Sequence, residues 1–517
     1  MHLRFYPITS FTILEDNKLF AICAIYDSTD HKRSLWNSLS TLHTQHDFPW
    51  CFFGDFNSIV GLPMEEFQSW LDSNNLLHLP TRGVDFTWAN ARGGPRYTKR
   101  RLDRAICNHS LIDLCSSISV SSLTKLHSDH FPLLLDIKMN NFSFASQFKF
   151  MRMWTLHPAC KDIVQEAWNT TVIGYPMFVL NKKLKILKQK LRIWNKEVFG
   201  NVHEYVTDAE KNLQNIQEQI QVNGHSNNLL EAEKQAQKSL EDALNRQESF
   251  WQEKAKLNWH FEGDRNTKYF HRIAKIKSST KKITTLQDGE QVLTDQSQIV
   301  DHVVSYYKNL FCTNHVLQEQ LLVEEVIPNI LSNEINNMLT MIPSHKEIKV
   351  AVFALNKDSA PGPDGYGAYF YQFFWNIVKE DVYKVVLQFF SFGWILPGYN
   401  SNIIALLPKS PNAISIDHYR SIAMSNFKFK VISKVLADRL AAIMPSIISQ
   451  EQMRFIHDRN INDFLCIASE AANLLYNKAY GGNLVMKIDI TKAFDNLDWH
   501  FLLKVLRNFG FNETFCH

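Results

Sequence analysis

The chain has 517 residues, which at about 150 residues per domain corresponds to three or four folded units and excludes a single small module. The hydrophobic fraction of 45% and the charged fraction of 21% are those of an ordinary globular protein, and they exclude a disordered, a collagen-like or a disulfide-framework chain. Lysine and arginine number 55 against 52 aspartate and glutamate, a net charge of +3, so any basic surface for nucleic acid must be local.

The first block of the sequence alternates short apolar, β-prone runs with turn residues, from Leu19 to Phe144. The runs read LFAICAIY, WCFFGDFN, VDFTWAN and HFPLLLDI. This pattern predicts an α/β or β-rich layered domain over residues 1–144. Little sequence precedes the first run that could supply the rest of such a domain, so we expect the block to begin midway through its fold.

The second block, residues 145–282, has the 3.6-residue apolar spacing of helices and a higher density of charge. A turn at Asn223 to Asn227 between two such stretches predicts an antiparallel helical hairpin. From Trp251 to Lys277 aromatic residues are interleaved with cations, a pattern that can stack on bases and neutralise phosphates. The alternative for this segment is an amphipathic helix with a buried aromatic face and solvated charges.

The third block, residues 283–517, mixes short helices and strands, which is typical of an α+β domain. Two prolines and three glycines predict that Ser359 to Gly367 is a loop. Near the end, Leu484 to Ile488 is predicted to be a buried strand that leads through Asp489 into an amphipathic helix.

Cysteine usage and hydropathy bear on the compartment of the protein. The eight cysteines are far apart, without a Cys-x-x-Cys pair, and this predicts reduced thiols, no structural zinc and no disulfide-linked partner. The most apolar long stretch, residues 385–407, is interrupted by Pro397, Gly398 and Asn400, and the N-terminus lacks the apolar core of a signal peptide. We therefore expect a soluble intracellular protein with no membrane partner.

Three polar motifs in the first block follow or flank apolar strands: GDFN with Asp55 and Asn57, RLDR with Asp103, and SDHFPLLL with Asp129 and His130. Hydrolysis of a phosphodiester needs such a set. One Asp orients or deprotonates a water, an Asn donates to a phosphate oxygen, and a His held by another Asp stabilises the developing charge, with a divalent cation assisting. GDFN alone is also what closes an ordinary turn after a strand, but three motifs in this order favour the hydrolytic site.

A second set of candidate residues lies in the third block. Asp489 at the end of a strand, with the aromatic Phe494 five residues later, is how a polymerase palm can hold a cation and a sugar ring. The alternative is that Asp489 caps a helix. Lys409 and Arg420, on a predicted hairpin, could grip phosphate oxygens, or they could be a solvated surface pair.

The first three motifs resemble the C-terminal half of the apurinic-endonuclease-like domain of LINE-type (non-LTR) retrotransposons, within the endonuclease/exonuclease/phosphatase superfamily. The similarity covers Leu19 to Ile137 and implies a partial β-sandwich of that type. It implies that Asp55 is the base, that Asn57 binds phosphate, that Asp103 holds the catalytic His130, and that Asp129 belongs to the metal site. It also implies that Tyr26 faces the substrate phosphate.

The remaining motifs resemble the fingers and first palm motif of LINE-type reverse transcriptases. They are PGPDG, LLPK with HYRSI, FKFKVISKVLADRL, EQMRFIHDRNINDFL and KIDITKAFDNLDW, and two connector motifs, WNKEVFGN and NWHFEGDRNTKYFHR, are most similar to plant elements. The resemblance implies that Asp489 binds both catalytic metals and that Phe494 screens the sugar's 2′ position. It further implies that Lys409 and Arg420 hold the incoming triphosphate.

Together these patterns predict a multidomain α/β and α+β chain: a partial endonuclease/exonuclease/phosphatase domain at residues 1–144, a helical connector at 145–282, and a partial right-hand polymerase at 283–517. The family activities are DNA nicking and RNA-directed DNA synthesis. The resemblance implies Mg²⁺ as cofactor, DNA and RNA as partners, and a nuclear or cytoplasmic location.

The same motifs indicate that both reaction centres are incomplete. The early Asn and the metal-binding Glu of the endonuclease have no counterpart, and the acids that follow Asp489 are Asp495, Asp498 and Glu513, without a Tyr-x-Asp-Asp hairpin. Because two cations need more than one carboxylate, we expect a truncated polyprotein that is catalytically inert as this chain. The alternatives are a non-catalytic nucleic-acid-binding remnant and a stand-alone phosphohydrolase of the endonuclease superfamily.

Overall fold

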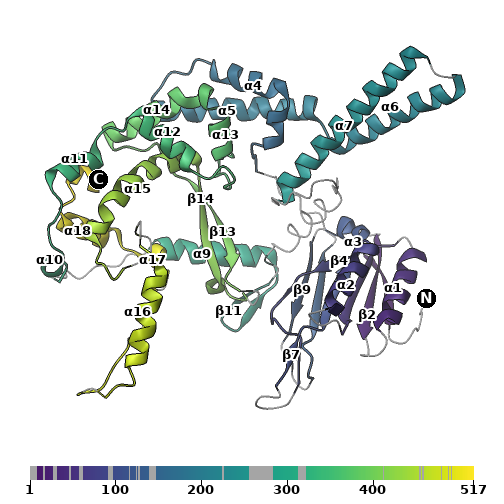
Figure 1. Cartoon of the computed structure of the whole chain (residues 1–517), viewed down its shortest axis with the longest axis horizontal. Coiled ribbons are helices and arrows are strands. Elements are labelled where there is room, and N and C mark those ends of the chain that lie inside the picture. The colour runs from purple at the N-terminus through teal and green to yellow at the C-terminus, as the bar shows by residue number, and fades with distance from the viewer. Residues whose placement is uncertain are drawn as a thin grey trace. The chain divides into compact units, whose positions relative to one another are not determined.

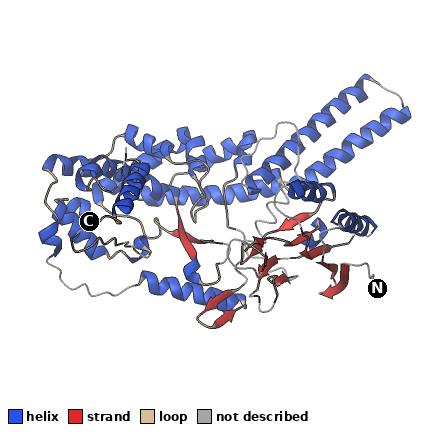
Figure 2. Cartoon of the chain, turned by 60° about the horizontal axis from the view of Figure 1, so that its bottom comes forward, coloured by secondary structure: helices blue, strands red, loops and turns tan. Residues whose placement is uncertain are grey.

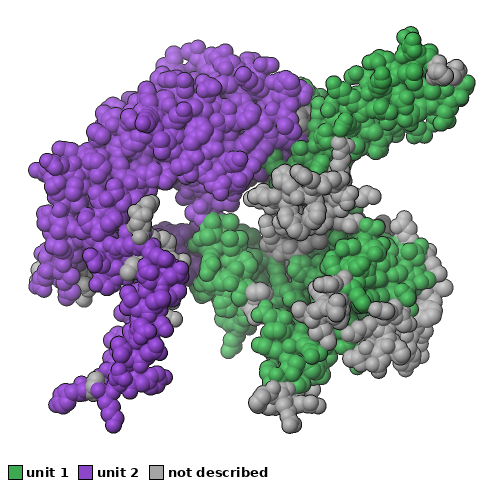
Figure 3. All heavy atoms as spheres, viewed as in Figure 1, with its two compact units in different colours: residues 1–146, 194–300, 405–422 green, residues 147–193, 301–404, 423–517 purple. Residues whose placement is uncertain are grey.

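The structure is a computed structural model (Figure 1). It describes residues 8–15, 18–26, 32–45, 48–57, 62–90, 97–115, 117–123, 125, 128–138, 147–223, 226–255, 283, 285–312, 322–410, 413–452, 456, 459–478, 480–486, 488, 490 and 492–517. Figure 2 shows that strands and helices both contribute, which confirms a mixed helical and sheet chain. Contacts divide the chain into two compact units (Figure 3). Unit 1 contains residues 1–146, 194–300 and 405–422, and unit 2 contains residues 147–193, 301–404 and 423–517.

The centre of unit 1 is a five-stranded sheet in the order β1-β2-β3-β8-β4. Its strands are β1 (Ile8–Glu15), β2 (Lys18–Tyr26), β3 (Trp50–Asp55), β4 (Leu77–Leu79) and β8 (Asp103–Cys107). β2 and β3 are parallel and are joined by helix α1 (Lys32–Gln45), whereas the other neighbours are antiparallel. A parallel pair needs such a crossover, because a tight turn can only reverse the chain.

Both faces of this sheet are covered. Helices α1 and α2 (Leu62–Ser73) pack on one face through an aromatic core that includes Trp36, Phe52 and Phe67. On the other face lie α3 (His109–Leu114), β9 (Ser117–Ser122) and β10 (Leu133–Lys138). Alternate residues of β3 serve the two cores, because side chains on a strand point to opposite faces in turn. Three short strands complete this region: β5 (Thr81–Arg82), β6 (Trp88–Ala89) and β7 (Lys99–Arg100).

The predicted helical hairpin is confirmed. Helix α6 (Val202–Asn223) and helix α7 (Asn227–Ala255) run antiparallel and pack along their length (Figure 1). Acidic residues outnumber basic ones on both helices. Of the predicted aromatic and cationic segment, Trp251 to Lys277, the part from residue 256 to residue 277 lies outside the described residues. A small two-stranded sheet comes next, from β11 (Leu286–Asp288) and β12 (Gln291–Leu293).

Unit 2 is mainly helical, and helices α5 and α9 cross its boundaries. Its helices are η2 (Arg152–Leu156), α4 (Pro158–Trp168), α5 (Pro176–Trp194), α9 (Gln296–Phe311), α10 (Leu322–Val326), α11 (Asn333–Thr340), α12 (His345–Ala354), α13 (Ala368–Phe373), α14 (Trp375–Phe392), α15 (Phe427–Ile447), α16 (Ile461–Leu474), α17 (Ala493–Asn496), α18 (Trp499–Phe509) and α19 (Glu513–Cys516). Strands β13 (Asn402–Pro408) and β14 (Tyr419–Ser425) also cross the boundary of unit 2 and form a two-stranded sheet, with η4 (Ile416–His418) between them in the part assigned to unit 1. The π-helical turn η3 (Asn195–Phe199) follows α5.

Buried polar contacts tie distant segments of unit 2 together. The hydroxyl of Tyr366 donates to the carbonyl of Leu184 at 3.0 Å, so the chain after residue 147 packs with the region around residue 366. The predicted loop at Ser359 to Gly367 is confirmed, and α13 begins at the next residue. In the part of the chain that the structure describes, we find no helix that is both long and apolar enough to cross a bilayer.

One sequence prediction is wrong. Leu484 to Ile488 is not a buried strand: its described residues form no strand, and Leu484 and Ile488 are 83% and 80% exposed. A strand satisfies its amides and buries its side chains only beside another strand, and within the described ranges none pairs with this segment. The amphipathic helix predicted after it is present as α18, which Asp498 caps by accepting from the amide of Phe501.

Candidate active site

Three of the predicted site residues lie in one row across the five-stranded sheet of unit 1. Tyr26 is opposite Asp55 in the β2–β3 register, and Asp55 is opposite Asp103 in the β3–β8 register. Gly54 makes this row possible. Its φ is +132°, and a Cβ there would lie 2.1 Å from the carbonyl oxygen of Ile25, so only glycine fits this close approach. Asp55 is the last residue of β3, so the row lies at the end of this strand, at the edge of the core.

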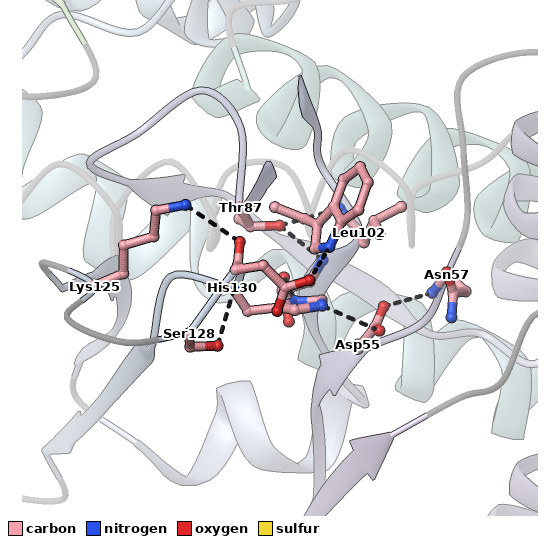
Figure 4. Close-up of polar contacts among 10 residues, drawn as sticks. Asp55, Asn57, Thr87, Leu102, Lys125, Ser128 and His130 are labelled. Atoms are coloured by element: carbon pink, nitrogen blue, oxygen red, sulfur yellow. Dashed lines mark hydrogen bonds and ion pairs between the residues drawn. The ribbon is translucent and has the colours of Figure 1, made fainter. Parts of the chain in front are cut away.

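His130 is the point where the predicted motifs meet (Figure 4). Its Nδ1 lies 2.9 Å from Oδ2 of Asp103, and its Nε2 lies 3.9 Å from Oδ2 of Asp55. The His130 side chain is 26% exposed, whereas those of Asp55 and Asp103 are 8% and 10% exposed. The imidazole therefore has a carboxylate on each side, and the partly open ring is the element that a substrate can reach.

Two further residues fix the carboxylates. Thr87 is fully buried, and its Oγ1 accepts hydrogen bonds from the amides of Leu102 and Asp103 at 3.0 and 2.9 Å. The amide of Asn57 donates to Oδ1 of Asp55 at 2.9 Å, and Asn57 takes the left-handed φ of +47° that this short turn requires. Sequence reasoning did not single out Thr87, although a lone hydroxyl between the apolar residues of FTWAN is a signal that could have found it.

The loop that carries His130 is tied to β6. Trp88 and His130 form a β-bridge, and the amide of Ala89 donates to the carbonyl of Asp129 at 3.0 Å. The indole Nε1 of Trp88 also donates to Oδ2 of Asp129 at 2.7 Å, and this bond holds the pKa of Asp129 below its usual value. The Ser128 hydroxyl accepts from the amide of His130 at 3.0 Å. Asp129 thus braces the loop rather than pointing at the imidazole ring.

The described oxygen atoms of this site are too few to surround a divalent cation. A hard divalent cation needs several oxygen ligands, commonly six, around one point. Within the described ranges, no group of three or more His, Cys, Asp and Glu side chains is arranged to hold a metal ion. Of the nearest acids, Asp103 faces His130 and Asp129 accepts from Trp88. The side chains that the structure describes at this site do not by themselves make up a set of ligands for Mg²⁺.

The predicted substrate residue Tyr26 is 71% exposed at the end of β2, beside Asp55 in register. For the polymerase set, Lys409 directly follows β13 and Arg420 lies in β14, so the predicted hairpin is confirmed, and both side chains are exposed. Nζ of Lys409 donates to the carbonyl of Asp417 at 2.8 Å. Phe494 is 93% exposed in α17, and Asp489 lies outside the described residues.

Comparisons with known proteins bear on the identity of the chain. Residues 407–517 match the reverse transcriptase (RNA-dependent DNA polymerase) family. Over 258 residues the chain is 26% identical to the uncharacterized 149 kDa protein of transposon TX1 from Xenopus laevis, a match that covers 49% of this chain and 19% of that protein. The chain therefore spans about a fifth of that relative. The affinity to plant elements predicted from the connector motifs has no support among these relatives.

Two solved structures are also similar in part. The endonuclease domain of TRAS1, a telomere-specific non-LTR retrotransposon, is 18% identical with a TM-score of 0.23, covering 26% of this chain and 64% of that one. Beta toxin from Staphylococcus aureus is 14% identical with a TM-score of 0.22, covering 25% and 57%. TM-scores this low carry no argument by themselves. The reverse transcriptase match and the transposon relative agree with the motifs, and together they support a LINE-type, non-LTR retrotransposon polyprotein.

Proposed function

We propose that residues 8–138 are the phosphodiester-binding part of an endonuclease/exonuclease/phosphatase-type domain, whose family reaction is the nicking of DNA. The observation that carries the proposal is the imidazole of His130 between the carboxylates of Asp55 and Asp103. A structural metal site or a turn after a strand does not require a histidine between two carboxylates. Phosphoryl chemistry does, because it needs a positioned donor and a positioned base. The reverse transcriptase match at residues 407–517 favours a polyprotein over a stand-alone phosphohydrolase.

In the family reaction, these residues of an intact domain would each have one task. Asp103 fixes the orientation of His130, and the Nε2–H of the imidazolium donates to a non-bridging phosphate oxygen. Asp55 orients a water and takes its proton as the water oxygen bonds to phosphorus, while the bond from phosphorus to the leaving sugar oxygen breaks and that oxygen takes a proton from solvent. Asn57 donates to a second phosphate oxygen, and Tyr26 lines the approach to the same phosphate.

The family reaction uses divalent metal ions, which neutralise the phosphate and the leaving oxygen. The described side chains around Asp55 do not make up a cage for such an ion. We therefore propose that this chain engages the DNA backbone through His130 and Asn57 but does not nick it at a useful rate. We also propose that the chain binds RNA as a second partner and that it is located in the nucleus or the cytoplasm.

We propose further that the chain around residues 407–517 supplies fingers and the start of a palm. Lys409 and Arg420 would hold the triphosphate, Phe494 would screen the sugar's 2′ position, and Asp489 would bind metal. The domain limits at residues 144 and 282 are proposals of the same kind. Support comes from the family match and from the two-stranded sheet that presents Lys409 and Arg420.

The test of the endonuclease proposal is DNA binding by fluorescence anisotropy, using the full chain and a short labelled duplex at several salt concentrations. We expect weak, salt-sensitive binding that falls at least threefold in His130→Ala and in Asn57→Ala. His109→Ala, remote from this site on α3, is the matched control and is expected to bind like the wild type. Equal binding by all four proteins would overturn the proposal.

A primer-extension assay tests the polymerase proposal separately. We expect no RNA-templated extension by this chain, and measurable retention of a labelled deoxynucleoside triphosphate that is weakened in Lys409→Ala. RNA-templated extension by the wild type that disappears in Asp489→Ala would show that the carboxylates of this chain suffice for polymerisation. It would contradict the expectation that the chain is catalytically inert.

A further inference from the structure

The β13–β14 hairpin is held at its base by polar side chains, some of them buried, that no catalytic role explains. Asn426 directly follows β14 and is 3% exposed. Its Nδ2 donates to the carbonyl of Tyr399, just before β13, at 3.1 Å. The hydroxyl of Ser425, the last residue of β14, donates to Oδ1 of Asn402, the first residue of β13. Both strand ends are therefore held to each other by side chains as well as by the ladder.

The PGPDG loop packs against this base. Oδ1 of Asn426 accepts from the amide of Asp364 at 3.0 Å. A Cβ on Gly362 would lie 2.4 Å from the amide nitrogen of Asn426, so the loop backbone approaches the Ser425–Asn426 peptide more closely than any other residue would allow. The glycine and the aspartate of the motif thus meet the hairpin at one residue.

The charge of Asp364 is balanced from the far side by Lys428. Nζ of Lys428 lies 3.4 Å from Oδ2 of Asp364, and the two side chains are 5% and 14% exposed. The same Nζ donates to Oδ1 of Asn181 in α5 and lies 4.8 Å above the ring of Tyr399. A buried cation and carboxylate hold one geometry, because separating them leaves an unpaired charge out of water.

We propose that Asp364, Asn426 and Lys428, the hairpin-base cluster, are positioning residues that fix both strand ends of the β13–β14 hairpin. The hairpin carries Lys409 and Arg420, so the importance of the cluster for nucleotide binding rests on the proposed polymerase function. The cluster itself draws on three separate segments: the PGPDG loop, the start of α15 and, through Asn181, helix α5. The PGPDG motif thus supports the hairpin that carries Lys409 and Arg420 and does not itself contact the nucleotide.

Hydrogen exchange of the full chain, read by mass spectrometry, tests the proposal. In Lys428→Met the carboxylate of Asp364 loses the cation that lies 3.4 Å from it, and we expect amides of β13 and β14 to exchange at least tenfold faster. Amides of α18 are expected to keep their wild-type rates. In the double variant Asp364→Asn with Lys428→Met both charges are gone, and we expect the hairpin rates to return to within about threefold of the wild type.

Lys434→Met is the matched control, because Lys434 lies on the same helix but pairs with Asp438 at the surface. It should leave the hairpin rates unchanged. Unchanged hairpin rates in Lys428→Met, or an equal acceleration of α18 and the hairpin, would overturn the proposal, as would a double variant that stays fast. Retention of a labelled triphosphate is measured on the same wild-type sample. Its absence would remove the polymerase role while leaving the exchange result to decide the cluster.

Discussion

Nδ1 of His130 lies 2.9 Å from Oδ2 of Asp103, although the two residues are 27 positions apart and belong to different elements. Asp103 opens β8, and its amide is held by Thr87, whereas His130 is held through its β-bridge to Trp88. Thr87 and Trp88 are adjacent in sequence. One dipeptide therefore anchors both partners, and the carboxylate and the ring keep their separation as long as β6 stays in place.

The tautomer of His130 tests this contact. Asp103→Asn keeps the size of the side chain and the backbone bonds to Thr87 but weakens the acceptor for Nδ1–H. We expect the Nδ1 resonance of His130, assigned by its loss in His130→Gln, to shift clearly in ¹⁵N NMR spectra of Asp103→Asn. Asp129→Asn is the matched control, because Asp129 accepts from Trp88 and not from the ring. A resonance that moves with Asp129 and not with Asp103 would refute the assignment of partners.

Gly54→Ala is expected to destabilise unit 1 by about 3 kcal/mol, because the new Cβ meets the Ile25 carbonyl at a backbone conformation that alanine avoids. Gly289→Ala is its control. Gly289 also has a positive φ, +59°, but no atom lies within 4 Å of the added Cβ, so only about 1 kcal/mol of backbone strain is expected. Urea unfolding curves measure both. Equal losses would mean that the close approach to Ile25 contributes nothing.

The pH dependence of stability should carry a contribution from His78. Burial, and then the nearby Arg104 and Arg101, lower its pKa from 6.5 to about 4. The folded state binds fewer protons than the unfolded state between these values, so stability is complete above pH 6.5 and falls as the pH drops toward 4. The loss is about 3 kcal/mol. His78→Gln is expected to flatten the urea-unfolding profile in this window, and an unchanged profile would contradict the assignment.

The Arg439 guanidinium is a buried cation of unit 2 that makes four hydrogen bonds. It is 6% exposed, binds both carboxylate oxygens of Glu347 at 2.7 and 3.0 Å, and donates to the carbonyls of Leu339 and Met341. Arg439→Met leaves Glu347 and two carbonyls without this partner, and we expect a loss of about 3 to 5 kcal/mol in urea unfolding. Arg507→Met, which breaks the exposed pair with Glu513, should cost much less. Similar losses would show that burial does not set the value of these pairs.

Local sequence patterns were sufficient to predict two features of the fold, a helical hairpin and a loop. The hairpin of α6 and α7 follows from apolar spacing around Asn223 to Asn227, and the loop at Ser359 to Gly367 follows from its prolines and glycines. These two signals lie within a few residues of the features that they predict. The pairing of Asp103 with His130 is implied by the resemblance of the polar motifs and not by a local pattern, because the two residues are 27 positions apart.

Features that depend on partners distant in sequence could not be predicted. The row of Tyr26, Asp55 and Asp103 depends on strand register, which pairs segments that are far apart in the chain. The segment from Leu484 to Ile488 reads as a strand, because its residue types favour one, but strands form only beside others. The packing of residues 147–193 within unit 2 could not be predicted from the sequence either, since helical periodicity does not say what a helix packs against.

Plasmid nicking in Mg²⁺ tests the central proposal, that His130, Asp55 and Asp103 form a phosphodiester site whose described carboxylates are too few to hold its cation. Supercoiled DNA is incubated with the full chain and with Asp55→Ala, and the fraction of open circles is followed over hours. We predict the same slow background for both proteins. Nicking by the wild type that disappears in Asp55→Ala would contradict the claim, because it would require a metal site that these side chains do not provide.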